Sequence, residues 1–112
     1  MNDRDVAALR EMVRLSSVGE ALAARGHDWY VGDSLNVPGL AAESVIIKIG
    51  QNFARVSAET TQMHPDVPWS LIKRMRDRLA HHYGGTDYEA VWDTLVVDLP
   101  VIRAYIESVS GE

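Results

Sequence analysis

Arg76, His81 and Tyr83 lie within one stretch of eight residues and could carry out phosphate chemistry. A guanidinium binds a phosphate and stabilises the added charge of a pentacoordinate phosphorane, while an imidazole transfers protons near neutral pH. Together these groups suit metal-free cleavage of RNA. The spacing alone is a weak signal, because a chain with nine Arg and four His holds about one such pair by chance. The surrounding sequence must therefore support the assignment.

A cluster of basic residues surrounds this stretch on an otherwise acidic chain. Four of the eleven positive charges fall within six residues, at Lys73, Arg74, Arg76 and Arg78. Only Asp77 opposes them. The formal net charge of −5 argues against nucleic-acid binding over the whole surface, so the cluster predicts a local contact with phosphates. A solvated helix face, balanced by acidic neighbours elsewhere in the fold, is an equally good interpretation.

The composition limits the classes of protein to which this chain can belong. A length of 112 residues predicts one domain with one site or interface, and 46% hydrophobic residues predict an ordered globular chain. The absence of cysteine excludes disulfides, thiolate metal sites and a cysteine nucleophile, and it fits a reducing compartment. The polar first residues lack a signal-peptide core, and no apolar run is long enough for a membrane span. We expect a cytoplasmic protein.

The first half of the chain predicts two helices. Apolar residues recur with a helical period over residues 4–25, with Asp3 as the cap and Gly26 as the stop. Residues 27–39 are rich in turn-forming types and predict a connecting loop. A second apolar stripe predicts a helix over residues 40–61.

A third helix should carry the chemistry. Asp66 and Pro68 are a helix start signal, and the pair Gly84-Gly85 should end this helix. The arrangement would place Arg76 on the helix and His81 close to its end. On an ideal helix their side chains diverge by about 140° at roughly 100° per residue. Either the helix ends before His81 or the two groups converge between two chains.

The last helix starts at a capping box of Thr86 and Glu89 and fades near Ser108. A regular spacing of three and four residues marks its packing seam, which consists of Trp92, Leu95, Leu99, Ile102 and Ile106. Pro100 removes a backbone donor and should kink the helix. No run alternates with period two. The sequence therefore predicts an all-α protein, an antiparallel four-helix up-down bundle with a kinked last helix.

The motif and its surroundings resemble the HepT group of HEPN-domain ribonuclease toxins. The matching stretches, in order, are Ile49-Gly50, Pro65 to Trp69, Met75 to Tyr83, Trp92-Asp93-Thr94 and Asp98-Leu99-Pro100. The resemblance spans residues from about 40 to 110, while the first helix agrees only in general character. We expect residues 1–112 to form a single HEPN-like helical domain. The resemblance implies a metal-independent endoribonuclease that needs no cofactor and works as the toxin of a type II or type VII toxin–antitoxin pair.

By position in the motif, Arg76 and His81 would be the catalytic pair and Asp77 a supporting residue. The resemblance further implies a homodimer and an antitoxin that is a small nucleotidyltransferase of the MntA type, which silences the toxin by attaching AMP to Tyr83. Candidate contacts with RNA phosphates are Lys73, Arg74, Arg78 and His82. The chain departs from the family at Lys48, where an apolar residue is common, at Gln51, where an acidic residue is common, and at His82, where Gly or Glu is usual.

One imidazole cannot readily act as both base and acid in a single cleavage event, and a two-fold dimer would supply a second His81. The expected products are a 2′,3′-cyclic phosphate and a 5′-hydroxyl.

Two alternative functions stay open. The chain could be a non-catalytic partner or substrate-binding subunit of a small nucleotidyltransferase, or a plain structural bundle. His27 and His64 have no ligand partners at metal spacing, so no metal is predicted.

Overall fold

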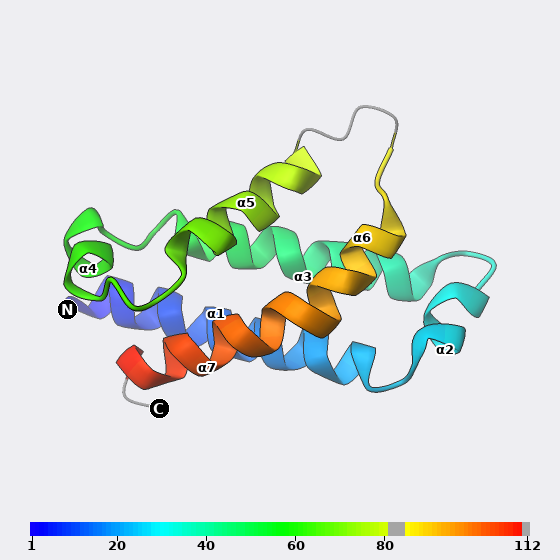
Figure 1. Ribbon diagram of the computed structural model, residues 1–112, viewed down its shortest axis with the longest axis horizontal. Helices are drawn as coiled ribbons and strands as arrows, with labels where there is room; N and C mark the ends of the chain where they lie inside the picture. The colour runs from blue at the N-terminus through cyan, green and yellow to red at the C-terminus, as the bar shows by residue number, and fades with distance from the viewer. Residues whose placement is uncertain (81–84, 111–112) are drawn as a thin grey trace.

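The computed structural model describes residues 1–80 and 85–110, and every regular element in these ranges is a helix (Figure 1). The all-α prediction is therefore confirmed. The elements are α1 (Asp3–Ala23), α2 (His27–Gly32), α3 (Val37–Phe53), α4 (Ala58–Met63), α5 (Trp69–Ala80), α6 (Tyr88–Asp93), the π-helix η1 (Thr94–Asp98) and α7 (Leu99–Ser110).

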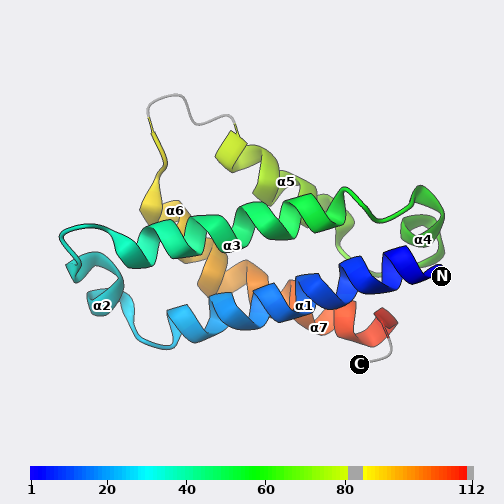
Figure 2. The same ribbon diagram turned by 180° about the vertical axis from the view of Figure 1, so that it is seen from behind.

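The long helical runs alternate in direction along the molecule. Figures 1 and 2 show α1 beside α3, and α7 beside α1, with the start of α1 and the end of α7 at the same end of the molecule as α4. Among the other helices α5 contacts mainly α3, and its far end rises away from the rest in both views. The molecule is thus less symmetric than an ideal four-helix bundle, and α5 presents much of its surface to solvent.

The ends of α1 follow local signals, although the cap differs from the predicted one. Asn2 caps the helix, because its side-chain oxygen accepts a hydrogen bond of 2.8 Å from the backbone N–H of Asp5. The predicted cap, Asp3, is instead the first helical residue. Beyond the other end Gly26 has a φ of 93°, a left-handed conformation that favours glycine.

Two predicted segments of the first half contain a short helix that was not expected. The predicted loop at residues 27–39 holds α2 and the first turn of α3. It is organised by Tyr30, which is buried and donates a hydrogen bond of 2.8 Å to the carbonyl of Tyr88. The predicted second helix ends at Phe53, and α4 follows as a separate helix capped by Ser57.

A buried carboxylate holds α4 against α1. Asp5 is 1% exposed, and its two oxygens accept hydrogen bonds from the backbone N–H and hydroxyl of Ser57, at 3.0 and 2.6 Å, and from the hydroxyl of Thr60. These hydrogen bonds, led by the Ser57 hydroxyl, lower the pKa of Asp5 against the opposing effect of burial. Asp5 therefore links the N-terminus to the chain that leads into α5.

The last helical run begins one residue later than predicted and contains a π-helical turn. Asp87 is the cap, since its side chain accepts hydrogen bonds from two backbone N–H groups, whereas the predicted cap Thr86 donates its hydroxyl elsewhere. The N–H of Leu99 donates to the carbonyl of Thr94, five residues back. Pro100 follows directly and has no N–H to donate. The wider turn thus lies where the proline interrupts the ordinary helical hydrogen bonds.

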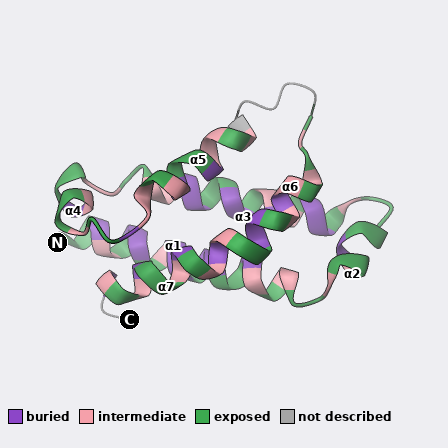
Figure 3. Ribbon diagram, in the orientation of Figure 1, coloured by how far each residue is buried: buried purple, intermediate pink, exposed green. Residues whose placement is uncertain are grey.

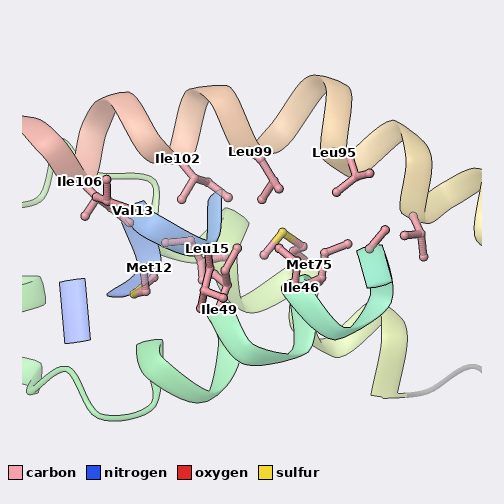
Figure 4. Packing of buried hydrophobic residues seen from close by; sticks show 14 of the residues in the cluster. Met12, Val13, Leu15, Ile46, Ile49, Met75, Leu95, Leu99, Ile102 and Ile106 are labelled. Carbon is pink, nitrogen blue, oxygen red and sulfur yellow. The ribbon is translucent and has the colours of Figure 1, made fainter. Parts of the chain in front are cut away.

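The core lies where the apolar faces of α1, α3, α5 and the last run meet (Figures 3 and 4). Its members include Leu9 and Met12, Ile46 and Ile49, Ile72 and Met75, and Leu95, Leu99, Ile102 and Ile106. Each such side chain contributes about 1.5–3 kcal/mol through burial. The predicted seam of the last helix is confirmed from Leu95 to Ile106, while Trp92 is only partly buried. In the described ranges no helix is long and apolar enough to cross a membrane.

Candidate active site

Helix α5 is amphipathic, and this property determines which of its residues face solvent. Ile72 and Met75 are buried in the core, and Leu79 continues their stripe as a partly buried residue. Lys73, Arg74 and Arg78, which the sequence predicted as phosphate contacts, are all exposed. Arg76 lies between the two faces, with 38% of its side chain exposed. The helix thus holds the Arg76 stem against the protein and leaves its guanidinium accessible.

The stem of Arg76 packs on α3 at Gly50. A Cβ atom at Gly50 would lie 2.7 Å from Cγ and 2.9 Å from Cδ of Arg76, closer than non-bonded carbons approach. Only glycine leaves room for this contact. The close approach fixes the stem of Arg76 relative to α3, which gives a structural reason for the Ile49-Gly50 pair in the sequence.

Asp77, the predicted supporting residue, follows Arg76 in the sequence and its side chain lies close to the guanidinium. Its Oδ1 is 3.5 Å from Nη2 of Arg76, and 43% of its side chain is exposed. A pair this open to solvent is weak, typically below about 1 kcal/mol. Asp77 can orient the guanidinium without neutralising it, so Arg76 keeps its capacity to bind an anion.

A pocket of about 410 Å³ opens between α3 and α5 beside Arg76. Its lining residues are Glu43, Ile47, Gly50, Gln51 and Ala54 from α3, and Arg76 and Leu79 from α5. The α3 residues recur every three or four positions and so form one face of the helix. The pocket combines apolar walls with a carboxylate, an amide and a guanidinium, a composition typical of small-molecule sites.

Glu43 is a site residue that the sequence analysis missed. Its Oε2 accepts a hydrogen bond of 2.7 Å from the hydroxyl of Thr86, and its Oε1 accepts one of 2.8 Å from the hydroxyl of Tyr88. The bond to Glu43 raises the pKa of Tyr88. Position 43 belongs to the same helical stripe as Ile47 and Gly50, which was the available signal. The carboxylate ties α3 to the chain just before α6.

The basic face of α5 has an acidic neighbour on the last helical run. Burial raises the pKa of Asp98, and the positive charges of Arg78 and Arg74 oppose this effect. Both arginines therefore act on a carboxylate of the protein. This finding agrees in part with the interpretation of the cluster as a face balanced by acidic neighbours, and it sets Arg76, on the α3 side, apart from Arg74 and Arg78.

The remaining predicted site residues, His81, His82 and Tyr83, lie outside the described residues. The other two histidines lie elsewhere in the molecule. His27 is within 2.9 Å of Glu89 and contacts the ring of Trp92 edge-on, and the carbonyl of His64 accepts a hydrogen bond from the Trp69 indole. In the part of the chain that the structure describes, no three His, Cys, Asp or Glu side chains gather as a metal site would require.

Comparison with known proteins places this site in a family. The family model described as "Ribonuclease HepT-like" matches residues 14–109, a range that includes Gly50, Arg76 and the whole motif. No solved structure matches the chain.

Three curated proteins are similar over shorter segments. The chain is 34% identical over 59 residues to a protein of Thermococcus cleftensis named "Probable ribonuclease HepT", covering 53% of the chain and 54% of that protein. It is 34% identical over 68 residues to a "Putative RNase" of Methanocaldococcus jannaschii, with 57% and 56% covered. It is 31% identical over 61 residues to a "Putative RNase" of Caldanaerobacter subterraneus, with 54% of each covered. The matched segments thus span about half the length of these relatives.

Proposed function

Because this chain belongs to the HepT-like ribonuclease family, we propose that it is a metal-independent endoribonuclease that acts on RNA in the cytoplasm. The observation that carries the proposal is the placement of Arg76. Its stem is fixed against Gly50, its guanidinium is accessible, and a pocket large enough for a nucleotide adjoins it. A guanidinium held in this way can bind the scissile phosphate and stabilise the phosphorane.

The proposed reaction is attack by the ribose 2′-oxygen on the adjacent phosphorus. A base removes the 2′-hydroxyl proton, the P–O5′ bond breaks, and an acid protonates the departing 5′-oxygen. The products are a 2′,3′-cyclic phosphate and a 5′-hydroxyl. His81 is the proposed proton carrier and Arg76 the cation. Asp77 is proposed to orient the guanidinium, and Lys73 and His82 to contact neighbouring phosphates.

The active form is proposed to be a homodimer. A single His81 cannot serve as base and acid in the same event, whereas a two-fold axis beside α5 would bring two copies together. Mixing wild-type protein with an equal amount of His81→Ala protein tests this. If both copies are needed, statistical exchange leaves about one quarter of the dimers active. Activity equal to half that of the wild type would instead mean that each chain works independently.

Control by an antitoxin is the remaining part of the proposal. A small MntA-type nucleotidyltransferase would attach AMP to Tyr83, and the added anionic group would compete with RNA for Arg76. Co-expression with such an enzyme should increase the mass of the Tyr83 peptide by one AMP group and abolish cleavage. An unmodified peptide from a silenced protein would contradict this mechanism.

Growth arrest separates a toxin from a non-catalytic subunit of a nucleotidyltransferase. Expression of the chain alone in a bacterial host should stop growth, and Arg76→Ala should restore it. Arg55→Ala removes an exposed arginine at the end of α3 and should leave toxicity unchanged. Growth unaffected by the wild-type protein, together with stable binding to a nucleotidyltransferase, would favour the subunit function.

A further inference from the structure

We propose that the pocket between α3 and α5 binds a guanine base of the RNA, with Glu43 accepting hydrogen bonds from the base N1–H and N2–H groups. This inference rests on the proposed ribonuclease function and names the base that the site selects. Cleavage should then occur on the 3′ side of guanosine.

The Glu43 carboxylate is held in a fixed orientation before any ligand binds. Thr86 and Tyr88 each donate a hydroxyl hydrogen bond to a different oxygen, at 2.7 and 2.8 Å. A carboxylate has about four acceptor positions in total, so each oxygen can accept another hydrogen bond. Glu43 also lines the pocket, and the bound base would use its remaining acceptor positions. The two hydroxyls thus preorganise an acceptor pair for a ligand with two adjacent donors.

Guanine matches this acceptor pair better than the other bases. Single-stranded RNA is read on the Watson–Crick edge of its unstacked bases. On that edge guanine presents two neighbouring donors, N1–H and N2–H, which can pair with both carboxylate oxygens. Adenine and cytosine each present one amine beside an unprotonated ring nitrogen, which a carboxylate would repel. Uracil presents one N–H between two carbonyl groups.

The other pocket walls suit the faces of a base. Ile47 contributes an apolar side chain from α3 and Leu79 one from α5, and Ala54 continues the α3 wall beyond Gly50. Ile47 is 42% exposed, so binding a flat ring would remove apolar surface from water. A volume of about 410 Å³ lies in the range of small-molecule sites and accommodates a nucleoside.

The spacing along α3 places the phosphate on Arg76. Glu43 and Gly50 are seven residues apart on one face, which corresponds to about 10 Å along the helix axis. The stem of Arg76 packs at Gly50, so this arginine lines the pocket about two helical turns along α3 from Glu43. This separation is similar to the span of a nucleotide from its Watson–Crick edge to its 3′-phosphate. A base paired with Glu43 would therefore deliver its phosphate to the catalytic cation.

Calorimetric titration with guanosine 3′-monophosphate and adenosine 3′-monophosphate tests the pocket without any cleavage step. Wild-type protein should bind the guanosine nucleotide about 10- to 100-fold more tightly. Glu43→Gln should remove this preference, because its amide offers a donor where the base also has one. Glu59→Gln, an exposed substitution on α4, should retain the preference. Equal affinities in the wild type, or a preference that survives Glu43→Gln, would overturn the proposal.

A second variant avoids the hydrogen bonds that Glu43 makes within the fold. Ala54 is exposed at the pocket rim, and Ala54→Phe should fill the pocket and weaken binding of guanosine 3′-monophosphate at least about 10-fold. Ala21→Phe, on an exposed position of α1, is the matched control. Unchanged binding by Ala54→Phe would place the ligand elsewhere and refute the pocket.

The two proposals fail in different ways. Guanosine-selective binding without cleavage of any RNA would refute the ribonuclease function and leave the pocket standing. Cleavage with no selectivity for guanosine would refute the pocket alone.

Discussion

Gly50 of α3 and Arg76 of α5 are in such close contact that a Cβ atom on the glycine would lie 2.7 Å from Cγ of the arginine. The contact joins the two helices that form the pocket, and it positions the stem that carries the guanidinium. A glycine inside a helix costs roughly 0.5–1 kcal/mol relative to alanine. We infer that the site retains this cost because the position of Arg76 requires it.

Gly50→Ala should reduce RNA cleavage more than it reduces stability. The new methyl group must displace the Arg76 stem, and misplacement of a catalytic group by about 1 Å can cost about 100-fold in rate. The gain in helix propensity, about 1 kcal/mol, offsets much of the overpacking cost of about 1–3 kcal/mol. Initial cleavage rates and thermal unfolding of the same preparation measure both effects.

Gly32→Ala is the matched control, since no atom lies within 4 Å of the Cβ position at Gly32, which ends α2 far from the pocket. Its cleavage rate should equal that of the wild type. Full activity in Gly50→Ala would show that the contact does not position Arg76.

Asp5→Asn should lower the free energy of unfolding at neutral pH. It should also make this free energy less sensitive to acid pH. The variant presents an amide donor to the hydroxyl donors of Ser57 and Thr60, and an unsatisfied buried group of this kind costs about 1–3 kcal/mol. The folded protein lowers the pKa of Asp5 below its ordinary 3.8. Its stabilising effect is therefore present above pH 3.8 and is lost as the pH falls through the lower folded pKa.

Urea unfolding at several pH values measures this contribution. The wild type should lose stability below about pH 4, and Asp5→Asn should lose less. Asp66→Asn, at an exposed position before α5, should differ from the wild type by less than about 0.5 kcal/mol. If the free energies of unfolding of the wild type and Asp5→Asn changed in parallel with pH, Asp5 would not be the source of the acid-dependent loss of stability.

Tyr30→Phe should remove a phenol whose titration is shifted to high pH. Burial, followed by the negative charge of Glu89, raises the pKa of Tyr30 to about 12. A raised folded pKa stabilises the fold below pH 10, and this stabilisation is lost as the pH rises towards 12. Phenolate absorbance should show the late step in the wild type and not in the variant. The lost hydrogen bond to the Tyr88 carbonyl should cost about 1 kcal/mol of stability.

Local patterns predicted the helices well where one apolar face decides the structure. The stripes of α1, α3 and the last run appear as buried residues in the structure, and Gly26 ends the first helix as expected. The predicted helix boundaries were wrong where a tertiary contact competed with a local sequence signal. Thr86 was predicted as a cap, but Glu43 takes its hydroxyl and Asp87 caps α6 instead. The helix α2 was missed because one contact that organises it involves a residue distant in the sequence: Tyr30 donates its hydroxyl hydrogen bond to the carbonyl of Tyr88.

At the candidate site, too, the sequence predicted what depends on neighbouring residues and missed what depends on residues distant in the chain. The motif identified Arg76, and the structure places it beside a pocket, but the role of Gly50 became clear only from the packing of two helices. Glu43 was missed because its partners, Thr86 and Tyr88, lie more than forty residues away. A short motif can indicate a candidate residue, whereas the pocket walls beside it come from residues that only the fold brings together.

We propose that Arg76 serves in metal-independent cleavage of RNA. The direct measurement is incubation of purified protein with a labelled single-stranded RNA in excess chelator, followed by analysis of the product ends. The wild type and Arg55→Ala should produce fragments with 2′,3′-cyclic phosphate and 5′-hydroxyl ends, and Arg76→Ala should lose at least about 100-fold in cleavage rate. Intact RNA with the wild-type protein, or equal cleavage by Arg76→Ala, would contradict this proposal.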